Sequence, residues 1–332
     1  MSEKESSISY KLHKEIDEIN SQIFCVKYSP DNESILVGCG DGHLKVFDAH
    51  DGRNMYTWNT AGKSGIKLPV TSIKFRPFTK TRKNIVLVAG SGGLVQHWHI
   101  TSGRCLNTIS EENNQVYAVD YRSDGKFFAT TGKDTCVRVY DEATKSLVVK
   151  MQGGIGNKTA GHANRVFTLK FHPTDPNVLV SGGWDNTVQI WDKRQDTAVR
   201  RIFGPKLCGE SLDIDKKGVI LTGSWRNKNQ LQLWDYGTGK LIEDISLPVD
   251  PQTQQHTSIY SATFNSTANL IAIGGSGTND AKVIDRHTGK IIGSTASLEK
   301  AFYSVAFSPD NQNVAAAGGD GNIYILKKSS SN

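Results

Sequence analysis

Two glycine-rich segments contain the residue types of known catalytic or phosphate-binding loops. Residues 90–93, Gly-Ser-Gly-Gly, place a serine among glycines as in a nucleophile elbow. That elbow joins a strand to a helix, whereas this segment falls in a turn between two predicted strands. Residues 38–42 resemble a phosphate loop in their glycine content alone, because no helix and no Lys-Ser or Lys-Thr pair follow. Neither segment predicts chemistry.

Histidine and aspartate supply the other candidates. His97 and His99 would share one face of a strand and could bind a metal, but no third ligand lies near them in the sequence. Residues 213–218 begin like a calcium loop and then place lysines where oxygen ligands belong. His162 and Asp185 are two of the residue types of a catalytic triad. We expect no enzyme, no metal and no cofactor.

The composition is that of a folded, mildly basic chain. Its 332 residues include 39 Lys and Arg against 33 Asp and Glu, a net charge of +6, and 37% are hydrophobic. No apolar run approaches the roughly 20 residues of a membrane helix, and the polar start of the chain lacks a signal core. The five cysteines are scattered, which favours reduced core residues. We therefore expect an intracellular, cytoplasmic protein that does not bind membranes, with the nucleus or a cilium as alternatives.

A phrase of the form Gly-x-Asp, then alternating apolar residues, then aromatic-Asp recurs along the chain and is complete at residues 183–192. Seven copies place the aromatic or equivalent residue at positions 47, 98, 140, 191, 234, 284 and 326. An alternating apolar segment precedes each copy, as in residues 23–28, and others follow it, as in residues 241–245. Each repeat is therefore predicted to be a four-stranded meander in an all-β fold.

These repeats resemble those of the WD-repeat family, since Trp191-Asp192 and Trp234-Asp235 carry its dipeptide and Gly161-His162 carries its Gly-His signature. The resemblance implies a seven-bladed β-propeller of four-stranded antiparallel blades. It also implies a buried hydrogen-bonded tetrad in the fourth blade, which accounts for its histidine and aspartate without catalysis. The residues of that tetrad are His162, Ser181, Asp185 and Trp191.

The ends of the chain predict how the ring closes. The seventh repeat stops after its third strand, and residues 9–16 have the texture of the missing fourth strand. We expect them to complete the last blade and remove its exposed edge. The whole chain, 1–332, is then one propeller domain, with a flexible 1–8, repeats over 17–326 and a flexible 327–332.

The resemblance also implies that peptides bind at one mouth of the channel, on the side with the loops from each fourth strand to the next first strand and from each second strand to the third. The second residue of each innermost strand should lie there, and five of the seven are aromatic, a set suited to an extended peptide or a cationic side chain. The alternative is that these rings only plug the channel. The remaining two of the seven are Thr71 and the acid Glu210, which would add charge selectivity. The predicted partner-binding residues are Phe24, Tyr117, Phe167, Glu210, Tyr260 and Tyr303, with Trp184 and Trp225 beside them.

We therefore predict a non-catalytic scaffold that presents its loop faces to two or more proteins within a larger intracellular assembly. One alternative is a substrate receptor of a cullin-based ubiquitin ligase, because Trp191-Asp192-Lys193-Arg194 resembles the Trp-Asp-x-Arg box and Arg194 would contact the ligase adaptor. Another is a structural component of the cytoskeleton or ciliary axoneme, for which a basic rim of Lys80, Arg82, Lys83, Lys193 and Arg194 would suit tubulin. Nucleic-acid binding has no supporting stripe of basic and aromatic residues, and no small-molecule substrate is expected.

Overall fold

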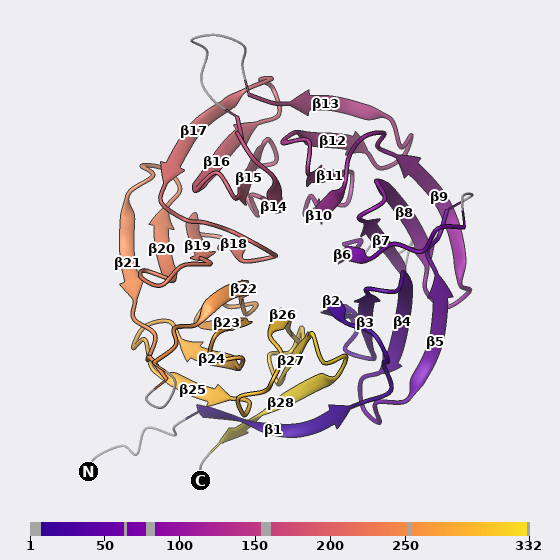
Figure 1. Cartoon of the computed structure of the whole chain (residues 1–332). Helices are drawn as coiled ribbons and strands as arrows, with labels where there is room; N and C mark the ends of the chain where they lie inside the picture. The colour runs from indigo at the N-terminus through magenta and orange to yellow at the C-terminus, as the bar shows by residue number, and fades with distance from the viewer. Residues whose placement is uncertain (1–7, 63–64, 78–83, 154–160, 251–253, 331–332) are drawn as a thin grey trace.

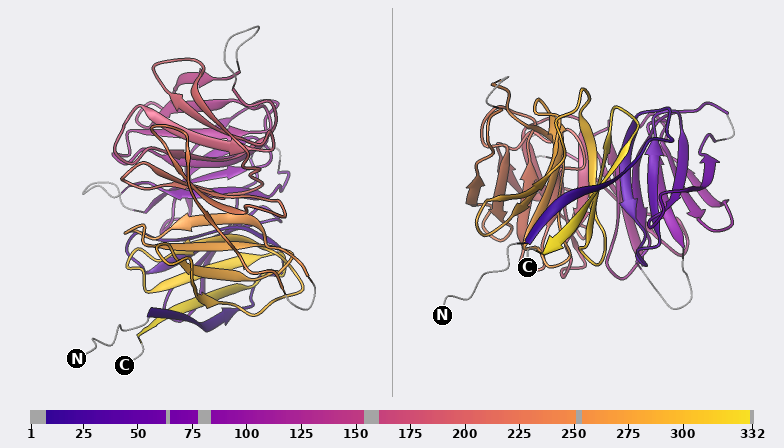
Figure 2. Two further views of the ribbon diagram at one scale, coloured as in Figure 1. Left: turned by 90° about the vertical axis from the view of Figure 1, so that its left-hand side faces the viewer. Right: turned by 90° about the horizontal axis from the view of Figure 1, so that it is seen from below.

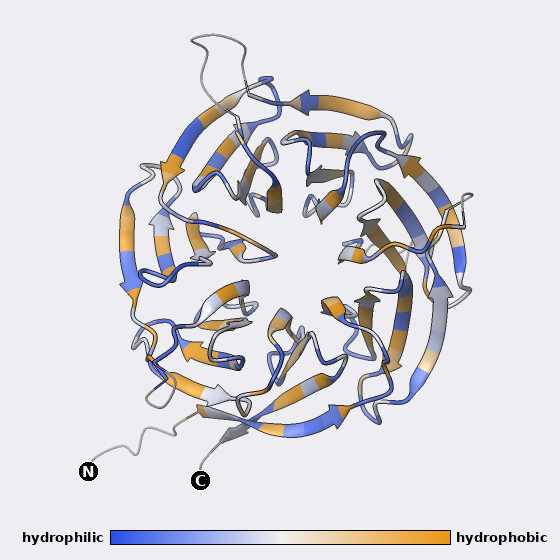
Figure 3. Cartoon of the chain, viewed as in Figure 1, coloured by the Kyte–Doolittle hydropathy of each residue, from blue (hydrophilic) through white to orange (hydrophobic). Residues whose placement is uncertain are grey.

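The secondary structure consists of short strands, of which some alternate apolar and polar residues and others are buried on both faces. The computed structural model describes residues 8–62, 65–77, 84–153, 161–250 and 254–330, and no helix occurs among them. The strands form a ring around a central channel (Figure 1). Colouring by hydropathy shows orange and blue segments alternating along many strands (Figure 3), as expected for side chains that point to opposite faces of a sheet.

Each of the seven blades is a meander of neighbouring antiparallel strands, with the first strand innermost. The innermost strands are β2 (Ile23–Tyr28), β6 (Val70–Phe75), β10 (Val116–Tyr121), β14 (Val166–Phe171), β18 (Leu212–Ile214), β22 (Ser258–Phe264) and β26 (Phe302–Phe307). The second strands are β3 (Ser34–Cys39), β7 (Ile85–Gly90), β11 (Phe127–Gly132), β15 (Val178–Gly183), β19 (Val219–Gly223), β23 (Leu270–Ser276) and β27 (Asn313–Gly318).

The outer half of each blade follows the same order. The third strands are β4 (His43–Asp48), β8 (Leu94–His99), β12 (Val137–Asp141), β16 (Thr187–Asp192), β20 (Leu231–Asp235), β24 (Ala281–Asp285) and β28 (Ile323–Ser330). The fourth strands are β5 (Asn54–Asn59), β9 (Arg104–Ser110), β13 (Leu147–Met151), β17 (Ala198–Phe203), β21 (Leu241–Ile245) and β25 (Ile291–Ser294), and β1 (Ile8–Ile16) serves the last blade. The seven-bladed all-β fold predicted from the sequence is confirmed.

Strand β1 closes the ring, as predicted. It pairs antiparallel with β28 and, at Tyr10 opposite Gly293, parallel with β25, so the sixth and seventh blades share one eight-stranded sheet. Figure 2 shows indigo β1 lying along yellow β28. Tyr10 is buried in the apolar cluster between these two blades, and Ile16 in the cluster between the seventh and first blades. One strand thus seals two interfaces.

The prediction of a flexible C-terminus over residues 327–332 is wrong for residues 327–330, because they belong to a paired strand. Strand β28 continues to Ser330, where residues 327–330 lie opposite residues 8–11 of β1. The polar Lys-Lys-Ser-Ser sequence gave no apolar pattern, but β1 is nine residues long and offers backbone partners beyond Leu326. Ile8 belongs to β1 as well, while residues 1–7 and 331–332 lie outside the described residues.

Apolar side chains between adjacent blades form the core. Trp191, Phe47 and Phe128 are among the largest fully buried side chains, and each contributes to a cluster that joins two neighbouring blades. In the part of the chain that the structure describes, no helix has the length and hydropathy needed to cross a membrane.

Gly293 permits the close approach of β1 to β25. A Cβ atom there would lie 2.5 Å from Cβ of Tyr10 and 2.6 Å from its carbonyl oxygen. The substitution Gly293→Val should therefore separate the strands and lower the free energy of unfolding by about 2 kcal/mol. Chemical denaturation measures this, with Ser294→Val as the control because Ser294 is exposed on the same strand. Equal stability of the two variants would contradict the closure argument.

Candidate functional site

The seven residues predicted for the second positions of the innermost strands meet around one cavity of about 400 Å³, here called the mouth cavity. Five of them are the second residues of their strands, whereas Tyr260 is the third residue of β22 and Glu210 precedes β18. In those five strands residues one and three are buried in the blade, so residue two points into the channel; in β22 residues two and four are buried instead. All seven of these side chains are half-buried. They are Phe24, Thr71, Tyr117, Phe167, Glu210, Tyr260 and Tyr303, and Pro69, Ser91, Cys208 and Gly209 complete the lining.

The aromatic side chains of the mouth cavity contact one another in two groups. Tyr117 stacks on Phe167 with ring centroids 4.7 Å apart. Across the cavity, Phe24 stacks on Tyr303 at 5.6 Å, and Tyr260 meets Tyr303 edge to face at 5.5 Å. Stacking restricts the rotamers of these rings, so the apolar wall of the mouth cavity is pre-formed.

Trp184 and Trp225 lie next to the mouth cavity, and each is 39% exposed. They line a second cavity of about 360 Å³, here called the tryptophan cavity, together with Asn164, Lys206, Cys208 and Tyr260. Cys208 and Tyr260 line both cavities, so the two adjoin. The Trp184 ring is 5.0 Å from the Phe167 ring, and its indole N–H donates to Sγ of Cys208 at 2.9 Å.

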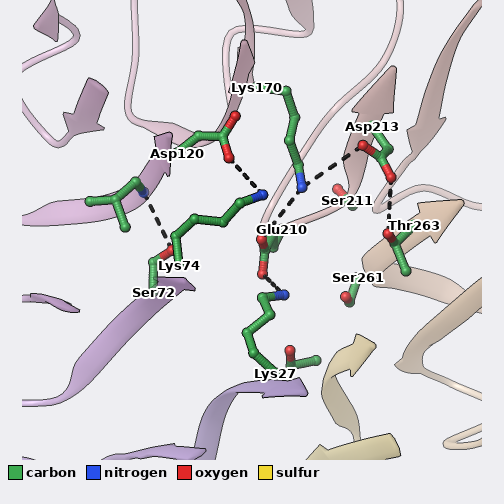
Figure 4. Close-up of polar contacts among 12 residues, drawn as sticks. Lys27, Ser72, Lys74, Asp120, Lys170, Glu210, Ser211, Asp213, Ser261 and Thr263 are labelled. Atoms are coloured by element: carbon green, nitrogen blue, oxygen red, sulfur yellow. Dashed lines mark hydrogen bonds and ion pairs between the residues drawn. The ribbon is translucent and has the colours of Figure 1, made fainter. Parts of the chain in front are cut away.

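Beyond Glu210 the channel contains a layer of compensating charges, the charge layer (Figure 4). Three lysines and two aspartates each lie three residues beyond a mouth residue; four of them are the fifth residues of their innermost strands, and Asp213 is the second residue of the short strand β18. Figure 4 shows Lys74 directed toward Asp120, and Lys170 between Glu210 and Asp213. The members of the charge layer are Lys27, Lys74, Asp120, Lys170, Glu210 and Asp213.

Glu210 belongs to this layer, which changes its expected role. Its carboxylate is 2.6 Å from Nζ of Lys27 and 3.8 Å from Nζ of Lys170. Burial opposes ionisation, but the two lysines outweigh it and lower the pKa of Glu210 to about 2. Its negative charge is therefore already compensated and does not by itself select a cationic ligand. Glu210 also precedes β18, which begins at Leu212.

The charge layer also ties the blades together. Asp120 accepts a hydrogen bond from the backbone N–H of Phe171 at 2.8 Å, and Asp213 accepts one from Phe264 at 3.0 Å, each on the following blade. Burial disfavours the charged form of Lys170, yet Asp213, Glu210 and Asp120 raise its pKa. Lys170 is thus held charged at neutral pH.

The four tetrad residues of the fourth blade are hydrogen-bonded as the resemblance implies. Nδ1 of His162 is 2.8 Å from Asp185, and Nε2 is 2.7 Å from Oγ of Ser181. The indole N–H of Trp191 donates to the same Oγ at 2.7 Å. Burial opposes ionisation of Asp185, but its hydrogen bond and ion pair with His162 lower its pKa. This network joins the loop before β14 to β15, β16 and their turn.

A second network of this kind occurs in the third blade and was not predicted. Glu111 takes the histidine position and accepts hydrogen bonds from Thr130 at 2.5 Å and from Tyr140 at 3.0 Å. Arg138 bridges Glu111, at 3.2 Å, to the turn residue Asp134. A search for the Gly-His signature cannot find this network, because glutamate replaces the histidine. The turn residue Asp134 and the pair Tyr140-Asp141, at the position of Trp-Asp, are the sequence features that could have indicated it.

The remaining candidates lie away from the mouth. Arg194 is 68% exposed, and its guanidinium donates to Asp192 at 2.5 to 3.1 Å. Lys193 covers the Phe127 ring at 4.2 Å. The other predicted basic-rim residues, Lys80, Arg82 and Lys83, lie outside the described residues.

The cysteines, all expected in the core, differ in their burial. All five cysteines are free; Cys25, Cys39 and Cys136 are buried, but Cys105 is exposed on β9 and Cys208 is half-buried at the mouth. The core reading is thus wrong for Cys105, which lies on an outer strand. Within the described residues, no group of three or more His, Cys, Asp or Glu side chains is arranged to hold a metal.

Removal of the Glu210 charge tests the charge layer. Glu210→Gln leaves Lys27 without its carboxylate and Lys170 with Asp213 alone, and should cost about 3 kcal/mol at neutral pH. Because the folded-state pKa is depressed, this contribution is present above about pH 4.5 and is lost as pH falls toward 2. Denaturant titrations at pH 7 and pH 3 should therefore show a smaller difference at pH 3. Glu243→Gln, at an exposed glutamate of β21, is the control; a pH-independent difference would contradict this assignment.

Comparison with known proteins agrees with the geometry. The family model described as "WD40: WD domain, G-beta repeat" matches residues 10–48, 103–141, 156–192 and 289–326. Pre-mRNA-processing factor 19 of Oryza sativa subsp. japonica is 24% identical over 325 residues, covering 96% of this chain and 56% of that protein. APC/C activator protein CDC20 of Saccharomyces cerevisiae is 23% identical over 293 residues, covering 74% of this chain and 47% of that protein.

A further relative is Target of rapamycin complex subunit wat1 of Schizosaccharomyces pombe, 29% identical over 174 residues, which are 51% of this chain and 52% of that protein. The chain spans about half the length of each of these three relatives. Seven blades closed by an N-terminal strand, a complete tetrad in the fourth blade and the match to four repeats show that the chain belongs to the WD40 repeat family.

Proposed function

We propose that this protein is a scaffold of an intracellular multiprotein assembly and that it holds a segment of a partner protein at the mouth cavity. Its membership of the WD40 family supports a role as a non-catalytic interaction protein. The observation that carries the proposal is the convergence of five aromatic residues of the innermost strands on a cavity of about 400 Å³, with two half-exposed tryptophans beside it.

Aromatic side chains at this density are typical of interaction hot spots, because they offer a large contact area and lose little conformational entropy on binding. The alternative, that the rings only plug the channel, fits less well. A plug would be packed like the blade interfaces, where Phe47 and Phe128 are fully buried. The mouth residues instead are half-buried and leave an open cavity between them.

The names of the relatives favour protein partners. One is a complex subunit and another an activator protein. The proposal treats residues 1–332 as one propeller domain in the cytoplasm, with the nucleus or a cilium as alternative locations. The ligase-receptor alternative depends on Arg194 alone, and the cytoskeletal alternative depends partly on residues outside the described ranges.

Replacement of three mouth residues tests the proposal. The variant with Tyr117, Phe167 and Trp184 changed to Ala removes the stacked rings and should reduce recovery of specific partners at least about tenfold, since hot-spot truncations cost more than 1 kcal/mol each. Affinity purification with quantitative mass spectrometry measures this loss. A matched control changes Leu106, Val148 and Leu241 to Ala, all exposed on outer strands.

Both variants should keep the melting temperature and circular dichroism of the wild type, since the replaced side chains are partly exposed. An unchanged partner list for the mouth variant would contradict the proposal. The aromatic residues would then be a channel plug, and the binding surface would lie on the opposite face or on the outer strands.

A further inference from the structure

A basic side chain lies over the ring of each of the two tryptophans at the mouth. The guanidinium of Arg165 lies 5.5 Å from the Trp184 ring centroid, and Nζ of Lys206 lies 5.2 Å from that of Trp225. Both basic residues are half-buried. Contact with an indole face holds each cation in place beside the cavities.

These two cations are not compensated. In the described part of the chain, neither Arg165 nor Lys206 has a carboxylate within 4.0 Å, whereas Lys27, Lys74 and Lys170 of the charge layer all do. Glu210 is the one carboxylate among the described residues that line the two cavities, and Lys27 and Lys170 compensate it. The mouth therefore combines an apolar wall with an unbalanced positive charge.

On the basis of the proposed function, we propose that the partner segment is an acidic peptide. A bulky apolar side chain enters the mouth cavity, and flanking Asp or Glu residues pair with Arg165 and Lys206 beside the tryptophan cavity. Hydrogen bonds between charged groups are stronger than neutral ones, and partial burial reduces their screening by solvent. A cationic ligand is disfavoured, since it would meet two cations and no free carboxylate.

A single-stranded nucleic acid is the main rival, because bases stack on aromatic rings and phosphates pair with basic residues. Binding of that kind needs a groove in which many cations follow the backbone. The two cavities are lined by one cation, Lys206, and Arg165 adds a second at their edge. Two cations beside a deep apolar cavity suit a peptide with one or two acidic residues better than a polyanion.

Selection from random 12-residue peptides displayed on phage tests the charge preference directly. Three forms of the full chain serve as bait: the wild type, Arg165→Glu with Lys206→Glu, and Tyr117→Ala with Phe167→Ala. A fourth form, Arg104→Glu with Lys216→Glu, changes the net charge equally at exposed sites away from the mouth. A fluorescent 12-nucleotide oligo-U RNA is titrated into the same proteins.

We expect wild-type selections to enrich peptides with Asp or Glu near a large apolar residue, and the Arg165/Lys206 variant to favour Lys or Arg. A synthesised wild-type peptide should bind the Arg165/Lys206 variant at least tenfold more weakly, but the Arg104/Lys216 variant as well as the wild type. Tenfold corresponds to 1.4 kcal/mol. Binding should also weaken as salt is raised.

Three results overturn the inference in distinguishable ways. Enriched peptides that need Tyr117 and Phe167 but lack acidic residues would refute the acidic partner and leave the mouth as a binding site. Absence of enrichment, or equal binding to the Tyr117/Phe167 variant, would refute the mouth as a peptide site as well. Binding of the RNA that depends on Arg165 and Lys206, without peptide enrichment, would assign the mouth to nucleic acid.

Discussion

Ring closure by β1 is the interaction on which the rest of the structure depends. A blade buries both of its faces against its neighbours, so an open ring would expose two faces and two strand edges at once. Tyr10 and Ile16, at opposite ends of one strand, complete the apolar clusters on either side of the seventh blade. The hydroxyl of Tyr10 also donates to the carbonyl of Asn311 at 2.6 Å. The mouth cavity exists only because this closure brings β26 next to β2, where Tyr303 can stack on Phe24.

Polar networks then set the relative positions of neighbouring strands and loops, which apolar packing alone does not determine. In the channel, carboxylates and serine hydroxyls of one innermost strand accept N–H groups of the next: Ser304 accepts from Val26 at 3.1 Å, as Asp120 does from Phe171. At the blade periphery, the His162 and Glu111 networks hold loops to the strands beneath them. Buried charges of this kind add little net stability when intact but cost much when a partner is removed. Their effect here is to set the positions of neighbouring innermost strands, and so the positions of the second residues at the mouth.

The sequence was sufficient for the fold, because seven copies of one alternating pattern leave few other ways to bury apolar faces. It also sufficed to identify the residues that line the mouth cavity, since strand alternation decides which side chains point into the channel. It failed where pairing or charge depends on distant parts of the chain. Lys327 and Lys328 carry no apolar pattern, yet β1 extends the last strand through them. Glu210 reads as a lone acid at the mouth, but Lys27, 183 residues away, neutralises it. The stacking of Arg165 and Lys206 on the tryptophans is equally invisible without the fold.

The contrast between the mouth and the charge layer has a physical consequence for recognition. In the layer, three lysines and three carboxylates balance, so the deep channel offers a ligand no net charge. At the mouth, the one carboxylate, that of Glu210, is paired with lysines of that layer. Arg165 and Lys206 instead contact indole faces, which supply no formal negative charge. An aromatic face stabilises a cation without neutralising it, so both groups keep their capacity to pair with a carboxylate. The arrangement that compensates Glu210 is thus what leaves the fourth and fifth blades positive at the mouth.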